Sequence, residues 1–236
     1  MIRIGLLGCG RIGQVHARTL KSLDTARIVA VADALPDAAK ALAESTGAEV
    51  RDTDAILNAG DIDAVVIGTP TDTHFDLIEA ATKASKAIFC EKPVDMSVAN
   101  IRKLMEGVDA AGVPFLTAFN RRFDPNFAAL QARLRGGEIG ALELIQITSR
   151  DPSPPPVGYI KSSGGLFRDM MIHDFDMARF LMGEEFTHVH AVGSSLVDPE
   201  IGRAGDAVES GGQGMCHGAV SSGTEGRKAS PLPGGA

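Results

Sequence analysis

The apolar residues in the first 120 positions of this 236-residue chain fall into short continuous runs. Runs of this length, rich in Val, Ile, Leu and Ala, are typical of parallel strands that are buried on both faces. They lie at residues 1–8, 28–32, 64–68, 87–90 and 113–119. Between them the spacing of apolar positions becomes helical, at residues 12–23, 36–45, 54–58, 74–85 and 98–111. This alternation predicts an α/β fold with a doubly wound parallel sheet. In the first of these helices the apolar side is formed by Ile12, Val15, Leu20 and Leu23.

The pattern changes after residue 120. Helical periodicity is seen at 125–135 and 166–182, whereas residues 142–148 alternate with period two, as in a half-exposed strand. A proline-rich loop spans 151–165, and 186–194 again has the composition of a strand. The order of strand, long loop, helix and strand predicts a second unit of α+β type, built on an open, mainly antiparallel sheet.

The segment 205–236 differs from both preceding parts. It contains nine glycines and only four larger apolar residues. Such a segment buries too little apolar surface to offset the entropy of ordering its backbone. We therefore expect it to be disordered, or to be non-native sequence.

The first strand leads directly into a glycine-rich turn. Gly8 permits the tight turn, Gly10 allows a pyrophosphate to approach the backbone, and Gly13 allows the helix to pack closely on the strand. The N-terminus of the helix then offers N–H groups to the phosphates. Asp33 follows the next strand, where a carboxylate accepts hydrogen bonds from an adenosine ribose. Because that carboxylate repels a 2′-phosphate and Ala34 supplies no compensating cation, the pattern predicts a Rossmann-type domain that prefers NAD to NADP.

Charge and cysteine content narrow the class of protein. A formal net charge of −7 argues against nucleic-acid binding and against binding to an anionic membrane surface. No apolar run approaches the roughly 20 residues that span a bilayer. The N-terminal apolar run is too brief for a signal peptide. Cys9, Cys90 and Cys216 form neither a disulfide framework nor a metal-ligand spacing. We therefore expect a cytoplasmic protein.

Polar residues follow two further strands, at the edge where a parallel sheet binds its ligands. Thr69-Pro70 comes after one strand and Glu91-Lys92-Pro93 after the next. A lysine that precedes a proline is held extended, so the Lys92 side chain projects from a fixed backbone. It is either a surface lysine in a turn or a group beside the cofactor, and its position favours the second. His74, near the start of the following helix, either faces the cofactor or caps that helix.

The second unit holds its own candidates. Asp169 and His173 are four positions apart on a predicted helix, which suits a carboxylate that orients an imidazole base or a polar pair on a helix face. A metal site is disfavoured because no second histidine stands at ligand spacing. Arg121 and its neighbour Arg122 either position a polyol or a cofactor phosphate, or pair with acids. Asp151 is a candidate for hydrogen bonding to a substrate hydroxyl, and the acids after His173 are interpreted as solvated or locally paired.

Together these motifs resemble the glucose–fructose oxidoreductase/inositol 2-dehydrogenase (Gfo/Idh/MocA) family over roughly residues 1–200. They are Gly8-Cys-Gly-Arg-Ile-Gly13, Val31-Ala-Asp33, Thr69-Pro70, Glu91-Lys-Pro93, Asn120-Arg-Arg-Phe123 and Gly165-Leu-Phe-Arg-Asp-Met-Met-Ile-His173. Within the family the chain looks most like the bacterial inositol 2-dehydrogenases. Relatives continue into a long C-terminal sheet, whereas here the resemblance stops near residue 206, so we expect a shortened copy.

The resemblance implies NAD-dependent oxidation of a secondary ring hydroxyl of a cyclic polyol, with myo-inositol giving 2-keto-myo-inositol. It implies that His173 takes the hydroxyl proton, that Asp169 orients His173, and that Lys92 hydrogen-bonds the reacting oxygen. Arg121 and Asp151 match polyol contacts, and the family suggests a homotetramer. The residues that we assign to the cofactor are Gly8, Gly10, Arg11, Ile12, Gly13, Asp33, Thr69, Pro70, His74, Glu91 and Lys92.

Two other functions remain open at this point. One is oxidation of a different sugar by a member of the same family, and the other is dinucleotide binding without catalysis. The domain organisation that we predict is a NAD-binding Rossmann domain at 1–120, a partial substrate and oligomerisation domain at 121–204, and the glycine-rich segment 205–236.

Overall fold

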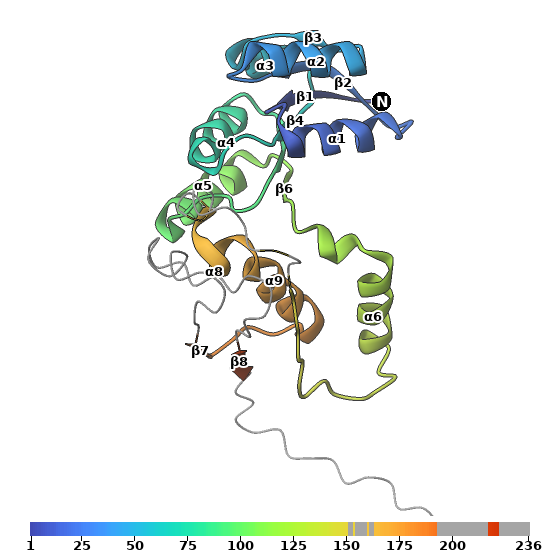
Figure 1. Ribbon diagram of the computed structural model, residues 1–236, viewed down its shortest axis with the longest axis vertical. Coiled ribbons are helices and arrows are strands. Elements are labelled where there is room, and N and C mark those ends of the chain that lie inside the picture. The colour runs from blue at the N-terminus through green and yellow to red at the C-terminus, as the bar shows by residue number, and fades with distance from the viewer. Residues whose placement is uncertain (151–152, 154–159, 161–162, 193–216, 222–236) are drawn as a thin grey trace, which may run out of the picture. The chain divides into compact units, whose positions relative to one another are not determined.

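The computed structural model describes residues 1–150, 153, 160, 163–192 and 217–221. It divides into two compact units, Met1–Phe119 and Asn120–Ala236 (Figure 1). The first unit holds a six-stranded sheet in the order β3-β2-β1-β4-β5-β6, and every pairing within it is parallel. The chain therefore builds outward from β1 in one direction, returns, and builds outward from β4 in the other. The predicted doubly wound parallel sheet is confirmed.

The strands of the first unit are β1 (Ile2–Leu7), β2 (Ala26–Ala32), β3 (Glu49–Val50), β4 (Ala64–Ile67), β5 (Ala87–Cys90) and β6 (Phe115–Thr117). Its helices are α1 (Arg11–Lys21), α2 (Pro36–Thr46), α3 (Thr53–Asn58), η1 (Thr71–Thr73), α4 (His74–Lys83) and α5 (Val98–Ala111). The helix α5 begins and ends as its sequence predicts: Ser97 accepts a hydrogen bond from the Asn100 N–H, and Gly112 closes the helix.

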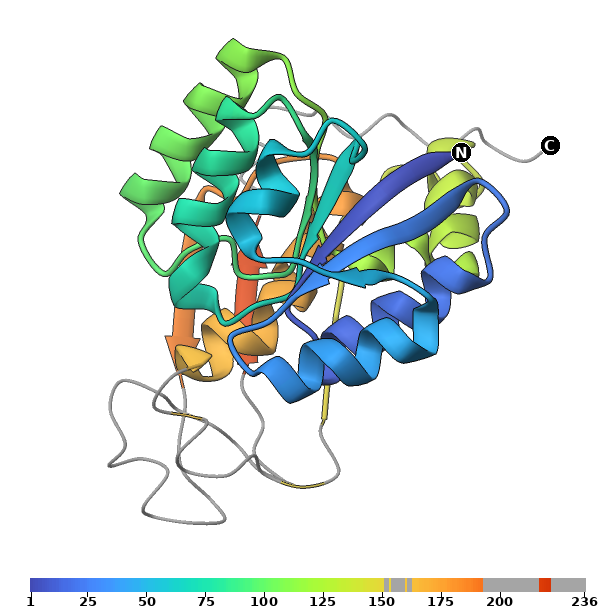
Figure 2. The same ribbon diagram turned by 90° about the horizontal axis from the view of Figure 1, so that it is seen from above.

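Helices cover both faces of this sheet. Figure 2 shows α1 and α2 along one face and α4 and α5 along the other. Successive strand residues accordingly belong to different cores: Leu6, Val31 and Val66 pack with α1 and α2, whereas Leu7, Val65 and Ile67 pack with α3, α4 and α5. Burial on both faces explains why these strands read as continuous apolar runs.

The apolar side that the sequence indicates for α1 is wrong in two places. Val15 is 39% exposed, and Leu23, which lies beyond the end of α1, is 45% exposed, whereas the buried residues of the helix are Gly13 and Ala17. Small residues four positions apart let α1 lie close against the sheet. The side of the helix that packs is therefore the side with the smallest side chains. Of the larger apolar side chains on this helix, Val15 is exposed, whereas Leu20 is partly buried against the core.

The second unit contains η2 (Asn120–Phe123), α6 (Pro125–Arg135), α8 (Gly165–Asp169), α9 (Met171–Met182), β7 (His188–Val192) and β8 (His217–Ser221). The strands β7 and β8 pair antiparallel, with Val189 opposite Val220. The strand expected at 186–194 is confirmed as β7, and the single helix expected at 166–182 is replaced by α8 and α9, which meet at Met170.

Two other expectations for this unit are wrong. Residues 142–148 form no strand, and Leu144 is 81% exposed there. Alternation alone does not make a strand, because a strand also needs a hydrogen-bonded neighbour. Conversely, β8 lies within the segment 205–236 that was expected to be disordered or non-native. Its backbone pairs with β7, and backbone pairing does not require large apolar side chains. The remainder of that segment lies outside the described residues.

The two described cysteines offer a direct test of the first core. Cys9 and Cys90 are at most 1% exposed, and burial raises the pKa of the Cys9 thiol to about 11 and that of Cys90 to about 12. In a Cys216→Ser background at pH 8, we expect neither thiol to react with Ellman's reagent until a denaturant is added, after which both should react. Rapid modification of either thiol in the native protein would contradict this packing.

Candidate functional site

The junction between β1 and α1 is built from backbone that leaves no room for side chains. Gly8 has a φ of +94°, and a Cβ placed on it would lie 2.6 Å from the carbonyl carbon of Gly68, at the end of β4. A Cβ on Gly13 would lie 2.0 Å from the carbonyl oxygen of Gly8. Glycine is therefore the residue that both positions require, the first for its left-handed backbone and the second for close helix packing.

Gly10 differs from its two partners. An added Cβ there would meet nothing within 4 Å, so the space beside its backbone is open. Gly10 is also the N-cap of α1, and it carries no side chain that caps the helix. The N–H groups of the first turn have no acceptor within the helix, and their dipole favours negative charge. This open cradle at a helix N-terminus fits the pyrophosphate of a dinucleotide.

The carboxylate of Asp33 holds this loop in place. One oxygen accepts a 2.6 Å hydrogen bond from the Cys9 N–H, and the other accepts a 2.8 Å bond from the Leu35 N–H. Asp33 is half-buried, and each of its oxygens retains a further lone pair for a ribose hydroxyl. The structure therefore adds a role that the sequence did not indicate: Asp33 ties the end of β2 to the glycine turn.

Backbone hydrogen bonds bring the predicted strand-end residues to one edge of the sheet. Gly8 N–H donates to Ala32 at 2.8 Å, Gly68 N–H donates to Leu7 at 2.8 Å, and Glu91 N–H donates to Ile67 at 2.9 Å. The turns after β1, β4 and β5 therefore leave the sheet side by side. The sequence-predicted cofactor residues of this unit follow these strands or lie at the start of the next helix: Gly8, Gly10, Arg11, Ile12, Gly13, Asp33, Thr69, Pro70, His74, Glu91 and Lys92.

His74 joins two of these turns. Its side chain is 1% exposed, with Nε2 lying 2.9 Å from the Thr69 carbonyl oxygen and Nδ1 lying 2.9 Å from the Pro93 carbonyl oxygen. Carbonyl oxygens only accept, so a neutral ring donates to one of them and a protonated ring to both. The helix-capping interpretation of His74 is wrong, because its ring contacts carbonyl groups rather than the N–H groups of α4.

Glu91 has a partner that sequence reasoning missed. Its Oε1 lies 2.7 Å from Nε2 of His16, and its Oε2 accepts a 3.3 Å hydrogen bond from the Lys92 N–H. The His16 ring also packs edge-on against Phe89, with ring centroids 5.2 Å apart. The available signal was that His16 lies one helical turn beyond Ile12, on the side of α1 that faces the sheet. The peptide bond that follows Lys92 is cis.

In the second unit Arg121 is bound by one carboxylate, which a serine hydroxyl also contacts. Its guanidinium pairs with the buried Asp174, and the Ser149 hydroxyl donates to the same carboxylate at 2.7 Å. Of the two alternatives that the sequence left for this arginine, pairing with an acid is therefore observed. The Asp174 pairing also corrects the expectation that the acids after His173 are solvated or locally paired, because 53 positions separate Asp174 from Arg121.

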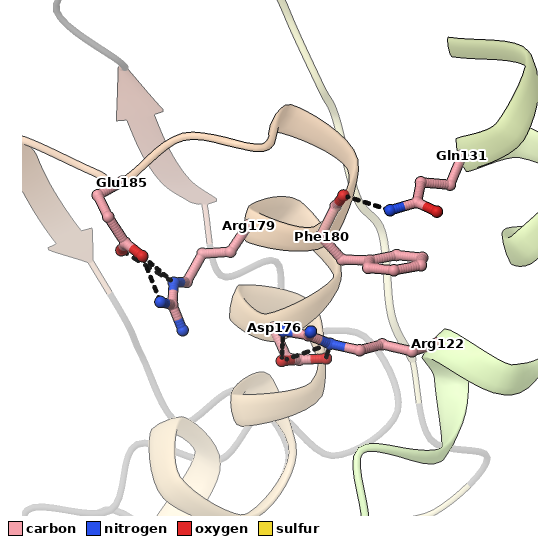
Figure 3. Close-up of polar contacts among 6 residues, drawn as sticks. All are labelled: Arg122, Gln131, Asp176, Arg179, Phe180 and Glu185. Carbon is pink, nitrogen blue, oxygen red and sulfur yellow. Dashed lines mark hydrogen bonds and ion pairs between the residues drawn. The ribbon is translucent and has the colours of Figure 1, made fainter. Parts of the chain in front are cut away.

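Arg122 repeats the arrangement one residue on. It binds Asp176 through two nitrogens at 2.6–3.1 Å, and its guanidinium lies 5.2 Å from the centre of the Phe180 ring (Figure 3). Asp176 is 5% exposed, so the cation compensates a buried carboxylate. Gln131 of α6 donates to the Phe180 carbonyl at 3.4 Å. Both arginines of η2 therefore anchor α9.

The predicted acid and base lie at a helix junction. Asp169 is the last residue of α8, and His173 is in the first turn of α9, where its N–H donates to Met170 at 3.2 Å. Their functional pairing stays a prediction. Asp151 lies outside the described residues. Among the residues that the structure describes, no group of three His, Cys, Asp or Glu side chains is arranged to hold a metal ion.

A sequence model described as "Oxidoreductase family, NAD-binding Rossmann fold" (GFO_IDH_MocA) matches residues 2–119, and the model of the corresponding C-terminal domain matches 127–223. The chain belongs to the Gfo/Idh/MocA family. The family and fold expected from the motifs are therefore confirmed. The second match extends into the segment 205–236, up to two residues beyond β8.

Relatives within the Gfo/Idh/MocA family share most of this chain. An inositol 2-dehydrogenase of Rhizobium meliloti (strain 1021) is 57% identical over 87% of the chain and 62% of its own length. A myo-inositol 2-dehydrogenase of Thermotoga maritima is 46% identical over 87% and 62%. A solved structure of a scyllo-inositol dehydrogenase from Lactobacillus casei, with bound NAD(H) and scyllo-inositol, is 32% identical over 87% and 63%, with a TM-score of 0.80. The chain thus spans less than two thirds of these relatives.

Within the described ranges of this Gfo/Idh/MocA chain, no helix has both the length and the apolar character needed to cross a bilayer.

The contrast between Gly10 and Gly13 yields a matched pair of variants. We expect Gly13→Ala to lower the thermal unfolding midpoint, because its Cβ would collide with the Gly8 carbonyl oxygen at 2.0 Å. We expect Gly10→Ala to lower that midpoint much less, by no more than the cost of alanine at an N-cap, but to weaken NAD binding by about tenfold or more, because the methyl group occupies the cradle. Differential scanning fluorimetry and isothermal titration calorimetry measure the two quantities. Unaltered NAD affinity in Gly10→Ala would place the pyrophosphate elsewhere.

The two roles of Asp33 are separable as well. In Asp33→Asn the amide oxygen still accepts the Cys9 N–H, and the exposed Leu35 N–H exchanges its lost acceptor for water, so we expect the fold to persist while the charge that repels a 2′-phosphate is lost. The ratio of NAD to NADP affinity should then fall by about 10- to 100-fold, the range for a charged hydrogen bond. Fluorescence titration with both nucleotides measures this ratio. A preference equal to that of the unmodified chain would remove Asp33 from cofactor selection.

Proposed function

We propose that this protein oxidises a secondary ring hydroxyl of a cyclic polyol with NAD, and that myo-inositol, giving 2-keto-myo-inositol, is its substrate. The observation that carries the substrate class is the 57% identity to an inositol 2-dehydrogenase over 87% of the chain. The bound scyllo-inositol and NAD(H) of the Lactobacillus casei relative point to the same chemistry.

The cofactor part of the proposal draws on the first unit. The open cradle beside Gly10 and the N-terminus of α1 suit the pyrophosphate, and the carboxylate of Asp33 suits the adenosine ribose. Thr69, Pro70 and Glu91 leave the same edge of the sheet, where ligands of such sheets bind. When bound, NAD supplies the acceptor for the hydride.

The chemical step that we propose removes a hydride from the ring carbon and a proton from its hydroxyl, leaving a ketone. His173 receives that proton on its imidazole, and Asp169 orients the ring and favours its protonated form. Lys92 donates a hydrogen bond to the reacting oxygen and stabilises the negative charge that develops there. It lies two residues beyond the end of β5 and is half-buried.

Arg121 is proposed as a polyol contact with a constrained guanidinium. Asp174 binds one side of that group and is itself held by the Ser149 hydroxyl, so the hydrogen-bond donors left for a polyol point in a direction set by the protein. Asp151 is proposed to accept a hydrogen bond from a further hydroxyl, as the family resemblance implies.

Replacing the proposed donor and base tests the chemistry. We expect Lys92→Met and His173→Ala to lower kcat for NADH formation from myo-inositol by about 100- to 10,000-fold, the range for lost acid–base and electrostatic assistance. Stopped-flow absorbance at the NADH band measures the rate. Lys83→Met is the matched control, since Lys83 is 72% exposed and pairs with Glu79 at the surface, and its kcat should not change.

Three outcomes separate the alternatives. Rates like those of the unmodified chain in Lys92→Met or His173→Ala would remove the role assigned to that residue. Turnover of another sugar in preference to myo-inositol, in a panel of polyols, would favour a different dehydrogenase of this family. Thermal stabilisation by NAD without turnover of any polyol would favour dinucleotide binding without catalysis.

A further inference from the structure

We propose that His74 and His16 are positioning residues that hold the Glu91-Lys92-Pro93 turn from its two sides, and thereby aim the Lys92 amine. This inference rests on the proposed function of Lys92 and extends it to two histidines that lie on different helices. Neither histidine is adjacent to Lys92 in the sequence, and neither is the proposed base.

The first constraint comes from His74. Its buried ring lies between two carbonyl oxygens, at 2.9 Å from Thr69 and 2.9 Å from Pro93. Thr69 leaves the end of β4, and Pro93 follows Lys92 beyond the end of β5. A single rigid ring therefore sets the spacing between the turn proposed to meet the cofactor and the turn that carries the proposed hydrogen-bond donor.

The ring itself is anchored by the helix that it begins. His74 is the first residue of α4. Ile78, one turn further along, is 0% exposed in the core between the sheet and the helices α3, α4 and α5. A helix packed in this way cannot shift without opening that core. The Pro93 carbonyl is therefore held in a fixed position relative to the packed core of the first unit.

The second constraint comes from His16 and acts through Glu91. The Glu91 carboxylate contacts His16 Nε2 at 2.7 Å with one oxygen and accepts the Lys92 N–H at 3.3 Å with the other. The side chains of His16 and Glu91 are 19% and 16% exposed, so solvent screens their interaction only in part. His16 lies on α1, whose first turn forms the proposed pyrophosphate cradle.

Lys92 is therefore flanked on both sides by residues that are each held to a different helix. Its own N–H is bound by Glu91, and the residue after it is bound by His74. Because a displacement of about 1 Å at a reacting group can cost about 100-fold in rate, such bracing matters most for a long, flexible side chain that must meet one oxygen. The alternative is that both histidines only stabilise the fold.

A double-mutant cycle separates the two explanations. If His74 acts through Lys92, His74→Gln lowers kcat by about 10- to 100-fold in the unmodified chain, but by no more than about twofold in the Lys92→Met background. A histidine that only stabilises the fold would lower kcat by the same factor in both backgrounds. The matched control is Leu42→Val in α2, which opens the core on the other face of the sheet and touches neither turn nor α4; it should lower the unfolding midpoint and leave kcat unchanged.

Two conservative variants sharpen the assignment. The amide group of Asn ends at the same distance from the backbone as Nδ1, so His74→Asn can keep the contact with Pro93. The amide group of Gln ends where Nε2 lies, so His74→Gln can keep the contact with Thr69. We expect His74→Asn to retain more of kcat than His74→Gln, because the contact with Pro93 is the one nearer to Lys92. The reverse order would overturn the proposed route.

Variants of His16 provide an independent test of the proposal if the His74 variants fail to fold. His16→Gln can keep a donor to Glu91, whereas His16→Leu removes it. We expect kcat to fall by about tenfold or more in His16→Leu and to stay within about twofold of the unmodified chain in His16→Gln. Equal kcat values in the two variants would show that the contact with Glu91 does not position Lys92.

A measurement without turnover distinguishes failure of this inference from failure of the proposed function. Hydrogen–deuterium exchange, followed by mass spectrometry, reports on a peptide that covers residues 88–97. We expect faster exchange there in His74→Gln and His16→Leu, with no change in a peptide that covers β2. If the unmodified chain turns over no polyol, the proposed function fails. The exchange measurement alone then decides whether the two histidines hold the turn in position. Unchanged exchange at 88–97 would overturn the positioning role whether or not the chain is active.

Discussion

The close approach of two backbones is the constraint on which the first unit depends. Gly8 leaves β1 against the main chain of Gly68 and Thr69 at the end of β4, at a distance that admits no Cβ. These are the two strands between which the chain reverses its direction of growth across the sheet. Because Gly13 in turn packs on Gly8, the start of α1 is held close to the centre of the sheet. An open cradle is left beside Gly10.

Around that junction, polar side chains serve mainly to hold turns in place. Asp33 binds the glycine turn, His74 binds the turns after β4 and β5, and His16 binds Glu91. All of these contacts except that of His74 with Thr69 join elements that are distant in the sequence, and each involves groups at least partly withdrawn from water. The edge of the sheet proposed to carry the chemistry is therefore braced by groups that need not touch a substrate themselves.

The second unit uses ion pairs for a similar purpose. Arg121 and Arg122, in η2, reach two carboxylates of α9 that are 9% and 5% exposed, and Phe180 lies beneath the second guanidinium. A buried ion pair contributes little net stability, because desolvation offsets its attraction, but removing one partner leaves an uncompensated charge. Such pairs therefore select one docking of η2 on α9 and disfavour others.

The sequence by itself determined the features that obey local rules: the buried strands, the glycine turn, the acid after β2, and the ends of α5. From these, the family and the cofactor class followed. It did not determine which faces pack or which polar groups meet. Residues 142–148 alternate but form no strand, β8 forms in a segment with few apolar residues, and α1 packs through Gly13 and Ala17. His74 and His16 are further cases, since their partners stand 5 to 75 positions away. Spacing along the chain reports only on neighbours within a helix or strand, whereas these contacts exist because folding brings separate turns to one edge of a sheet.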